Sequence, residues 1–374
     1  MTQLQDLYTL HNFIDTFALG HYARVMDGMD LKTNRQVAFK VMRPEHIARG
    51  EEPKWEYRAF HNEANLLIRL ADDPHIIRLY DCGYISSNAD APHDGEIESF
   101  GLDVEAFTAA TIRFSARGWR PYLALESLPR SQNLFYSMRP DRANLRFRLP
   151  TEEGITLALQ FGQTLRTAHN RGIIFLDHKL EHVYWDGETL RIIDWNSSRL
   201  LPEDQRDNSS YFRTDIHNLS VGILYSVFTG LSPHKAALRP QPGSQSEVET
   251  RYQDVTSLDF GVEPSLSVSI QQALQQGASQ ELENIDEFLL VWNRIAAQHG
   301  WSATGNYTSP ANREARDQMR DGLWRLRKGE EYIREARDLF RDAAVVDGVD
   351  EEVVGELRRL IKAVNETLNN RAIP

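Results

Sequence analysis

Hydrophobic and polar residues alternate along the beginning of this chain, whereas most of its later part has the apolar spacing of helices. The segment HNFIDTFALGHYARVMDGMDLKTNRQVAFKVM alternates around turn signals at Asp27-Gly28 and Thr33-Asn34, which predicts three antiparallel strands. A helical pattern follows in FHNEANLLIRL, where Leu66, Leu67 and Leu70 share one face. The chain therefore begins with a strand-rich part.

The later helices are predicted from their spacing and their end signals. Residues 151–171 begin with an acidic first turn and are closed by Gly172, and helices are also predicted over residues 213–230 and 281–300. After the linker WSATGNYTSP, two further helices are predicted over residues 311–345 and 350–370. The last one carries an apolar stripe formed by Val353, Val354, Leu357, Leu360, Ile361, Val364 and Leu368.

Candidate chemistry is concentrated in residues 175–195, FLDHKLEHVYWDGETLRIIDW. Two short apolar runs, residues 183–185 and 190–193, lie on either side of a turn signal at Asp186-Gly187 and predict a β-hairpin. Asp177 precedes this hairpin, Asp194 follows it, and Lys179 stands two residues after the first carboxylate. We therefore expect both carboxylates at the mouth of one hairpin, close enough to share a substrate.

Composition narrows the class of protein without identifying it. At 374 residues, 41% of them hydrophobic, the chain is long enough for two or three domains with a sizeable core. Its single cysteine, Cys82, excludes an intrachain disulfide, and no GxSxG or GxxxxGK[ST] motif occurs. The net charge of −12 argues against a general binder of nucleic acid or of anionic membranes. Because a run of about 18 apolar residues occurs nowhere, we expect a soluble, cytoplasmic protein.

The charged residues around the predicted hairpin resemble the catalytic loop and metal-binding segment of protein kinases. The family's HRDLKxxN stands here as FLDHKLEHV, and its DFG stands as Asp194-Trp195-Asn196. Its glycine-rich GxGxxGxV falls on Ala18, Gly20, Ala23 and Val25, so only the middle glycine is kept. The sequence VAFK, residues 37–40, has the family's spacing from that loop to the phosphate-binding lysine.

This resemblance implies ATP as the nucleotide and a role for each of five charged residues. Lys40 would bind the α- and β-phosphates, and Glu63, preferred over Glu56, would orient that lysine. Asp177 would accept the substrate proton, Lys179 would neutralise charge on the transferred phosphoryl group, and Asp194 would hold Mg²⁺.

The same resemblance implies the surroundings of the nucleotide. Adenine would lie between Val25 and Ala38 on one side and Tyr184 on the other, and Tyr184 could instead fill the pocket. Leu125 would be the gatekeeper, and backbone groups of Glu126 and Leu128 would meet the edge of adenine.

Five further residues bear on the metal site, the catalytic loop and the apolar positions behind the site. His182 replaces the family's metal-binding Asn; imidazole suits Mn²⁺ better than Mg²⁺, and the alternative is a packed histidine without a metal role. Asp215 is placed like the aspartate that braces the catalytic loop. The apolar positions behind the site are filled by Leu67, Phe175 and Trp195.

The implied fold is α+β and two-lobed, like that of protein kinases. Residues 1–128 would form the lobe with an antiparallel sheet and one helix, and residues 129–300 the helical lobe. Residues 86–120 would be an insertion, first a loop and then one or two strands. Residues 301–374 would form a linker and a helical hairpin. The insertion and the hairpin are candidate surfaces for a protein partner or for self-association.

Two functions remain open. The first is an atypical phosphotransferase that moves the γ-phosphoryl of ATP to a hydroxyl of Ser/Thr or of a small molecule. Its metal site would have fewer protein ligands than that of the family. The alternative is a catalytically impaired pseudokinase that binds nucleotide or acts as a scaffold. The five charged residues favour the first. His182 favours the second, as does the short segment between Asp194 and Asp215, which has no APE motif and so lacks a peptide platform.

Overall fold

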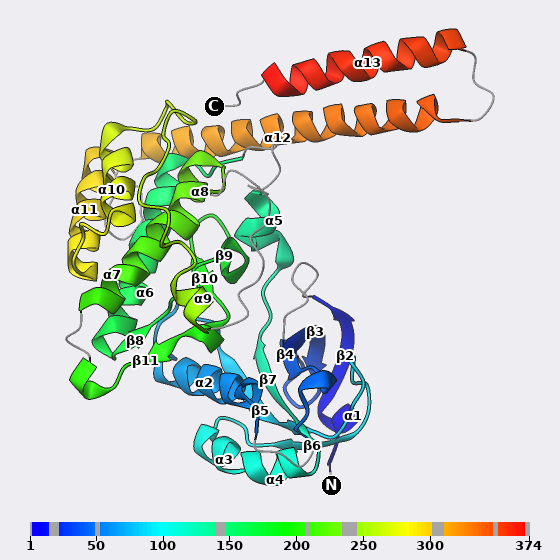
Figure 1. The fold of residues 1–374 in the computed structure, drawn as a ribbon, viewed down its shortest axis with the longest axis vertical. Helices are drawn as coiled ribbons and strands as arrows, with labels where there is room; N and C mark the ends of the chain where they lie inside the picture. Colours follow the sequence, from blue (N-terminus) through cyan, green and yellow to red (C-terminus); the bar gives the residue numbers. More distant parts are fainter. Residues whose placement is uncertain are drawn as a thin grey trace.

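The computed structural model describes residues 2–14, 22–48, 53–138, 147–205, 209–233, 245–300, 310–346 and 351–370. These residues form an α+β structure with a sheet-rich part, a helical part and a C-terminal pair of long helices (Figure 1). The domain boundaries at residues 128 and 300 stay a prediction. Among the described helices, none is long and apolar enough to cross a membrane.

The first part is built on an antiparallel sheet, which the described residues form with seven strands in the order β1-β6-β5-β7-β4-β3-β2. The strands are β1 (Thr2–Gln3), β2 (Tyr8–Phe13), β3 (Ala23–Asp30), β4 (Arg35–Met42), β5 (Leu79–Ile85), β6 (Glu96–Ser99) and β7 (Arg120–Glu126). A short helix, α1 (Leu4–Leu7), joins the first two strands. The three strands predicted near the N-terminus are thus confirmed as β2, β3 and β4.

One of the two predicted turns in this region is wrong. Asp27 and Gly28 lie inside β3, where Gly28 pairs with Leu10 of β2 and Val37 of β4. A Cβ at Gly28 would come within 2.7 Å of the Leu10 side chain, so the glycine permits a close approach rather than a turn. The turn at Thr33-Asn34 is confirmed, with Asn34 at a φ of 53°.

The insertion contains helices where a second strand was predicted. After β6 come α3 (Val104–Ala109) and α4 (Thr111–Ala116). The Asp103 carboxylate caps α3 by accepting the N–H of Ala106 at 2.9 Å. Phe107 and Phe114 are seven residues apart and pack on Tyr84, with ring centroids 5.0 and 4.6 Å away. Phe107 belongs to α3 and Phe114 to α4, and each packs its own short helix on the buried Tyr84 ring, so tertiary packing decides for helices where the alternation predicted strands.

Asp81 of β5 joins β2, β6 and β7 of the sheet through hydrogen bonds to its carboxylate. Its Oδ2 accepts the hydroxyls of Tyr8 and Tyr122 at 2.6 and 2.7 Å. Its Oδ1 accepts the Ser99 hydroxyl at 2.7 Å and the Gly101 N–H at 2.9 Å. The carboxylate, 7% exposed, therefore accepts from four donors that come from three other segments.

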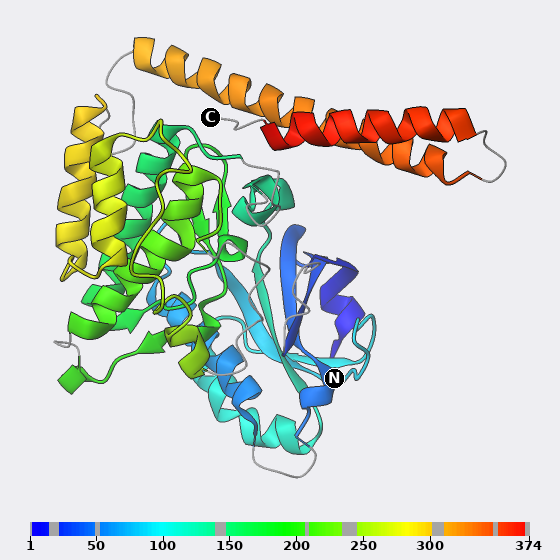
Figure 2. The same cartoon turned by 45° about the horizontal axis from the view of Figure 1, so that its top comes forward.

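The longest helix of the sheet-rich part is α2 (Trp55–Arg69), which follows a short 3₁₀ turn, η1 (Pro44–His46). Its apolar face is buried, as predicted, with Leu66 and Leu67 at 0% and 2% exposure. Glu63 on the same helix is also fully buried. The helix lies between the sheet and the helical part in both ribbon views (Figures 1 and 2).

The helical part begins after β7 and confirms the predicted helices within a few residues. It comprises η2 (Arg130–Gln132), α5 (Leu134–Met138), α6 (Thr151–Asn170), α7 (Ser209–Leu219), a π-helical turn η6 (Ser220–Leu224), α8 (Tyr225–Thr229), α9 (Gln245–Glu249), α10 (Val268–Ala278) and α11 (Ile285–Gln298). The helix predicted over residues 213–230 thus begins four residues earlier and contains a π-helical turn. It ends at Gly230, which has a φ of 69°.

The predicted hairpin is confirmed between α6 and α7. Strands β9 (Val183–Trp185) and β10 (Leu190–Ile192) pair in antiparallel register, and β8 (Ile173–Ile174) pairs with β11 (Arg199–Leu200). Three short 3₁₀ turns complete this region: η3 (Leu180–His182), η4 (Trp195–Ser197) and η5 (Glu203–Gln205).

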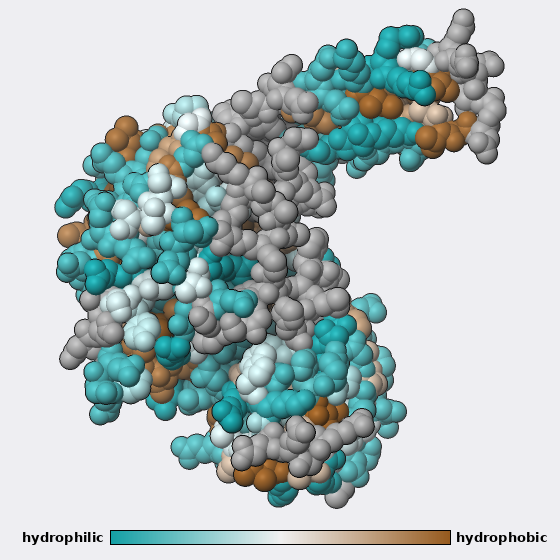
Figure 3. Space-filling model, in the orientation of Figure 1, coloured by the Kyte–Doolittle hydropathy of each residue, from teal (hydrophilic) through white to brown (hydrophobic). Residues whose placement is uncertain are grey.

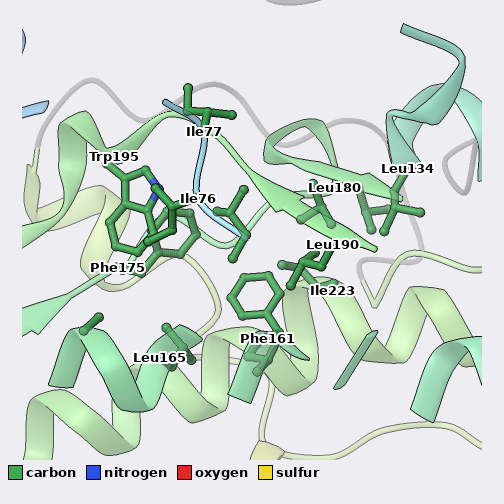
Figure 4. Close-up of a cluster of buried hydrophobic side chains, with 14 of the residues drawn as sticks. Ile76, Ile77, Leu134, Phe161, Leu165, Phe175, Leu180, Leu190, Trp195 and Ile223 are labelled. Carbon is green, nitrogen blue, oxygen red and sulfur yellow. The ribbon is translucent and has the colours of Figure 1, made fainter. Parts of the chain in front are cut away.

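A continuous hydrophobic core lies behind the hairpin. Phe175 and Trp195 are fully buried, their ring centroids are 4.7 Å apart, and they lie beside Ile76 (Figure 4). Leu67 belongs to the same buried cluster. The three apolar positions predicted behind the site are therefore all inside the core.

The C-terminal helices α12 (Pro310–Ala344) and α13 (Glu351–Asn370) pack against each other and extend away from the rest of the molecule (Figure 1). Hydrophobic side chains follow the line between the two helices, with hydrophilic side chains on either side (Figure 3). The two helices predicted after the linker are confirmed.

We predict that Asp81→Asn lowers the free energy of unfolding by about 1–3 kcal/mol, because an amide N–H₂ would face hydroxyl or N–H donors in a buried site. Chemical denaturation of both proteins measures the difference. Asp321→Asn, at an exposed position of α12, is the control and should be neutral. Equal stability of Asp81→Asn and the unchanged protein would contradict the assigned network.

Candidate functional site

The loop that carries Asp177 is held in place by a buried carboxylate from α7. Asp215 accepts the backbone N–H groups of Phe175 and Leu176 at 2.8 and 2.7 Å, and His169 Nε2 lies 3.0 Å from it. Leu176 has a φ of 66°, a backbone conformation that a leucine adopts only when its surroundings impose it. Asp215 thus braces this loop in the way that the sequence predicted.

Lys40 of β4 joins two carboxylates from distant segments. Its Nζ donates to Glu63 Oε2 of α2 and to Asp194 Oδ1, each at 2.7 Å. Glu56, the other predicted partner, instead lies 2.8 Å from His46 Nδ1. The preference for Glu63 as the neighbour of Lys40 therefore agrees with the contacts, while a role in binding nucleotide stays a prediction.

Both ends of the Lys40–Asp194 ion pair have shifted pKa values. Burial by itself would lower the pKa of Lys40, but Asp194 and Glu63 raise it well above its usual value. Burial would raise the pKa of Asp194, but the Lys40 and His182 cations hold it well below its usual range. The pair is consequently charged at neutral pH.

Asp194 follows β10 in a left-handed conformation, with a φ of 62°. This conformation is uncommon for a residue other than glycine, and such strain is found most often at functional positions. The second oxygen of Asp194, Oδ2, lies 3.2 Å from His182 Nε2. His182 Nδ1 in turn lies 3.0 Å from the carbonyl of Asp177. His182 thereby connects the Asp194 carboxylate to the backbone of Asp177.

Asp177 is almost completely buried, and its two oxygens differ in their surroundings. Oδ2 forms an ion pair with Lys179 Nζ at 2.7 Å. Oδ1 lies 3.5 Å from Arg251 Nη1, and within the described residues no hydrogen bond reaches it. A buried oxygen in this state can accept a hydrogen bond from a ligand.

The residues predicted around adenine lie partly together. Val25, Ala38, Leu125 and Leu128 pack into one hydrophobic cluster, and Ala38 pairs with Leu125 between β4 and β7. Tyr184 is half-buried on β9. Gly20 lies outside the described residues.

Glu126 is already engaged at two of its groups. Its backbone N–H donates to the Arg78 carbonyl at 2.9 Å, and its carboxylate accepts the Arg78 N–H at 3.1 Å and pairs with Arg191. A contact of adenine with Glu126 would therefore use another backbone group.

Sequence reasoning missed two residues that contact the site. Asn62 of α2 donates to the carbonyls of Asn196 and Ser198 at 3.1 and 2.8 Å, which ties α2 to the segment after Asp194. Arg251 reaches Asp177 from a loop 74 residues further along the chain. Asn62 could have been considered because it precedes Glu63 in the predicted helix, whereas no sequence signal pointed to Arg251.

The predicted metal residues offer few donors. Asp194 and His182 face each other, and a search of the described residues finds no group of three His, Cys, Asp or Glu side chains arranged to hold a metal ion. One carboxylate oxygen of Asp194 is paired with Lys40 and the other with His182. A metal ion would therefore have to displace one of these cations and obtain further ligands from a bound molecule or water.

Comparison with known proteins supports a distant relationship to protein kinases. The chain is 22% identical over 292 residues to atypical protein kinase C of Drosophila melanogaster. The aligned region covers 72% of this chain and 41% of that protein, so the chain spans less than half of its relative's length. No protein-family model matches the chain. The similarity suggests a kinase-like protein and agrees with the motif resemblance.

His178, in the loop that carries Asp177, generates a prediction about pH. Its ring packs on Phe161 and Phe175, and burial lowers its pKa from 6.5 to about 4. The unfolded chain therefore binds a proton at this residue before the folded chain does, and stability falls as the pH decreases from about 6.5 to about 4. We predict that His178→Leu reduces this loss, since leucine fills the same apolar space without titrating.

Urea denaturation at several pH values between 4 and 7 measures this effect. His11→Gln, at an exposed position of β2, is the control and should keep the pH dependence of the unchanged protein. If His178→Leu loses as much stability on acidification as the control, this buried histidine does not titrate as described.

Proposed function

We propose that this protein is a two-lobed, kinase-like ATP-binding protein and an atypical phosphotransferase. One observation carries the proposal. A continuous row of contacts runs from Glu63 through Lys40, Asp194 and His182 to Asp177 and Lys179. All five charged positions implied by the kinase resemblance belong to this row, although Lys40 and Asp194 are 154 residues apart in the sequence. The distant similarity to a protein kinase supports the same assignment.

Each residue of the row has a part in the proposed reaction. Glu63 fixes the Lys40 ammonium, which moves from Asp194 to the α- and β-phosphates of ATP. Lys179 turns from Asp177 to the γ-phosphoryl group, where it offsets negative charge. Asp177 Oδ1 accepts the hydroxyl proton of the substrate as the hydroxyl oxygen attacks. The bond between the γ-phosphorus and the β–γ bridging oxygen breaks, and ADP leaves.

A single divalent ion fits this set of residues better than two. Asp194 would supply the oxygen ligand once Lys40 has moved to the nucleotide, and the phosphates and water would complete the coordination. His182 offers nitrogen, so a second Mg²⁺ lacks its usual oxygen donor, whereas Mn²⁺ accepts imidazole more readily. The ion would supply positive charge at the β- and γ-phosphates.

The acceptor is a hydroxyl of Ser/Thr or of a small molecule, and a small molecule is favoured. The segment between Asp194 and α7 is short and contains only η4, β11 and η5 among its described residues. A peptide substrate would find little surface there.

The second candidate is a pseudokinase that binds nucleotide or acts as a scaffold. The observation that favours it is that both oxygens of Asp194 are paired with protein cations, Lys40 and His182. The pKa of His182 is raised by Asp177 and Asp194 against the effect of burial, so the imidazolium is favoured. A cation at this point can replace the charge of a metal ion. Under this alternative, the insertion and the C-terminal hairpin are the surfaces for a protein partner or for self-association.

ATP binding provides the first test. We predict that saturating ATP with Mn²⁺ raises the melting temperature, with a smaller shift for Mg²⁺ and the smallest without metal. At a hundredfold excess over Kd the stabilisation is about 2.7 kcal/mol, which thermal unfolding detects readily. Lys40→Ala should weaken ATP binding at least tenfold. An affinity unaltered by Lys40→Ala would show that the phosphates do not contact this lysine.

Phosphoryl transfer provides the second test and separates the two candidates. We predict that Asp177→Asn abolishes ADP formation and phosphorylated product, because the amide cannot accept the proton, while the affinity for ATP stays within about threefold. The measurement is ATP turnover with a panel of hydroxyl acceptors, with ATP affinity measured in parallel. Turnover equal to that of the unchanged protein would remove Asp177 as the base. Binding without any turnover in the unchanged protein would favour the pseudokinase.

A further inference from the structure

The two C-terminal helices each expose a row of large hydrophobic side chains. On α12, Tyr332 and Leu339 are 65% and 67% exposed, and on α13, Val353 and Leu360 are 46% and 39% exposed. Residues that are seven positions apart lie on the same side of a helix, so each pair forms a row along its helix. Large hydrophobic side chains gathered on a surface mark a contact with another molecule.

Both rows lie on one side of the helical pair. Each exposed residue directly precedes a half-buried hydrophobic residue of the same helix: Ile333, Phe340, Val354 and Ile361. These half-buried residues line the contact between α12 and α13, which run antiparallel (Figure 1). One step back along an α-helix is a rotation of about 100°, and in antiparallel helices it turns both rows toward the same side. We call the side formed by Tyr332, Leu339, Val353 and Leu360 the hairpin face.

The hydrophobic stripe of each helix is wider than contact with one neighbour requires. A pair of helices needs about two hydrophobic positions in seven, whereas helices around the core of a larger bundle carry about three. On α13 the adjacent pairs Val353-Val354 and Leu360-Ile361 widen the stripe, and on α12 Tyr332-Ile333 and Leu339-Phe340 do the same. This is the pattern of a four-helix bundle, of which one chain supplies two helices.

The charges beside the hairpin face differ between its two halves. Glu335 and Asp342 lie toward the connection between the helices, whereas Arg325 and Lys328 lie toward the other end of the pair. Lys328 also pairs with Glu331 of its own helix at 2.8 Å, and its side chain is 41% exposed. One half of the face is thus flanked by carboxylates and the other half by cations.

This division of charge makes the face complementary to itself in one orientation. Two hairpins packed with their connections together would bring the carboxylates of both copies side by side. Packed the other way, the acidic half of each copy lies over the basic half of the other. Exposed ion pairs contribute little energy each, but like charges facing each other are costly, so charge selects the second orientation.

The size of the hairpin face also suits a dimer. Helix α13 has 20 residues and is therefore about 30 Å long, and two helices side by side are about 20 Å wide. Two such faces together bury about 1,200 Å², which is at the lower end of the range for specific protein interfaces. An association of this size is expected to be reversible.

We infer that the hairpin face is a dimerisation surface, and that it is covered by the same face of a second copy of this chain. The two hairpins pack about a twofold axis into a four-helix bundle, with Asp342 of each copy opposite Arg325 of the other. This inference does not depend on nucleotide binding or phosphoryl transfer, so either can fail without the other.

The mass of the full chain in solution tests the inference. We expect sedimentation velocity to show a mass that rises from one chain to two as the protein concentration increases. The double variant Leu339→Glu with Leu360→Glu should weaken the dimer by roughly tenfold or more, because it buries carboxylates in the interface. Leu290→Glu, at a position of α11 that is 60% exposed, is the matched control and should dimerise like the unchanged protein.

Charge reversal tests the orientation of the two copies. Arg325→Glu and Asp342→Arg, both at exposed positions, should each weaken the dimer, because each places like charges opposite one another. The protein that carries both changes should dimerise more tightly than either single variant, since opposite charges face each other again.

Three results overturn the inference. The unchanged protein stays monomeric at every concentration, which would leave the hairpin face to a different partner; the double leucine variant dimerises as tightly as Leu290→Glu; or the combined charge reversal does not recover the dimer. Circular dichroism shows whether the variants keep their helices. If the double leucine variant loses them, the charge-reversal series decides.

Discussion

The arrangement of this molecule depends on the two ion pairs that the buried Lys40 ammonium forms with Glu63 and Asp194. This ammonium joins β4, α2 and Asp194, two residues after β10, and so connects the sheet-rich part to the helical part. Removing a charge from water costs several kcal/mol, and the cost is offset only while both carboxylates stay in contact. Asn62 supports the same geometry through the carbonyls of Asn196 and Ser198. Burial raises the pKa of Glu63, whereas the Lys40 and His182 cations hold the pKa of Asp194 well below its usual range, so Asp194 is the carboxylate of this group that is most firmly ionised.

A second constraint, the bracing of the Asp177 loop by Asp215, fixes the other half of the site. The loop backbone is strained at Leu176, and two hydrogen bonds to the buried carboxylate hold it there. This leaves Asp177 Oδ1 facing Arg251 rather than a backbone donor. Under the proposed function, nucleotide binding would act on one connected row of contacts, because the phosphates would release Lys40 from Asp194 and Lys179 from Asp177.

Much of this arrangement was predictable because it follows from local patterns. The strands β2, β3 and β4, the hairpin, α6 and the C-terminal helices have regular periodicity, and the positions of Lys40, Asp177 and Asp194 follow from spacing. The errors arose where tertiary packing decides. Gly28 looks like a turn residue but permits the close approach of Leu10, and Phe107 of α3 and Phe114 of α4 pack two short helices against Tyr84. Arg251 was not predictable, since its contact with Asp177 depends on the anchoring of Tyr252.

The central claim is that Lys40 exchanges Asp194 for nucleotide phosphate. A crystal structure with a non-hydrolysable ATP analogue and Mn²⁺ tests it most directly, through the distances from Lys40 Nζ to Asp194 and to the phosphates. The account predicts that Nζ stays on Glu63, leaves Asp194 Oδ1 and lies within hydrogen-bonding distance of an α- or β-phosphate oxygen, with Asp194 on the metal ion. Nucleotide bound elsewhere, with the Lys40–Asp194 ion pair still at 2.7 Å, would contradict it.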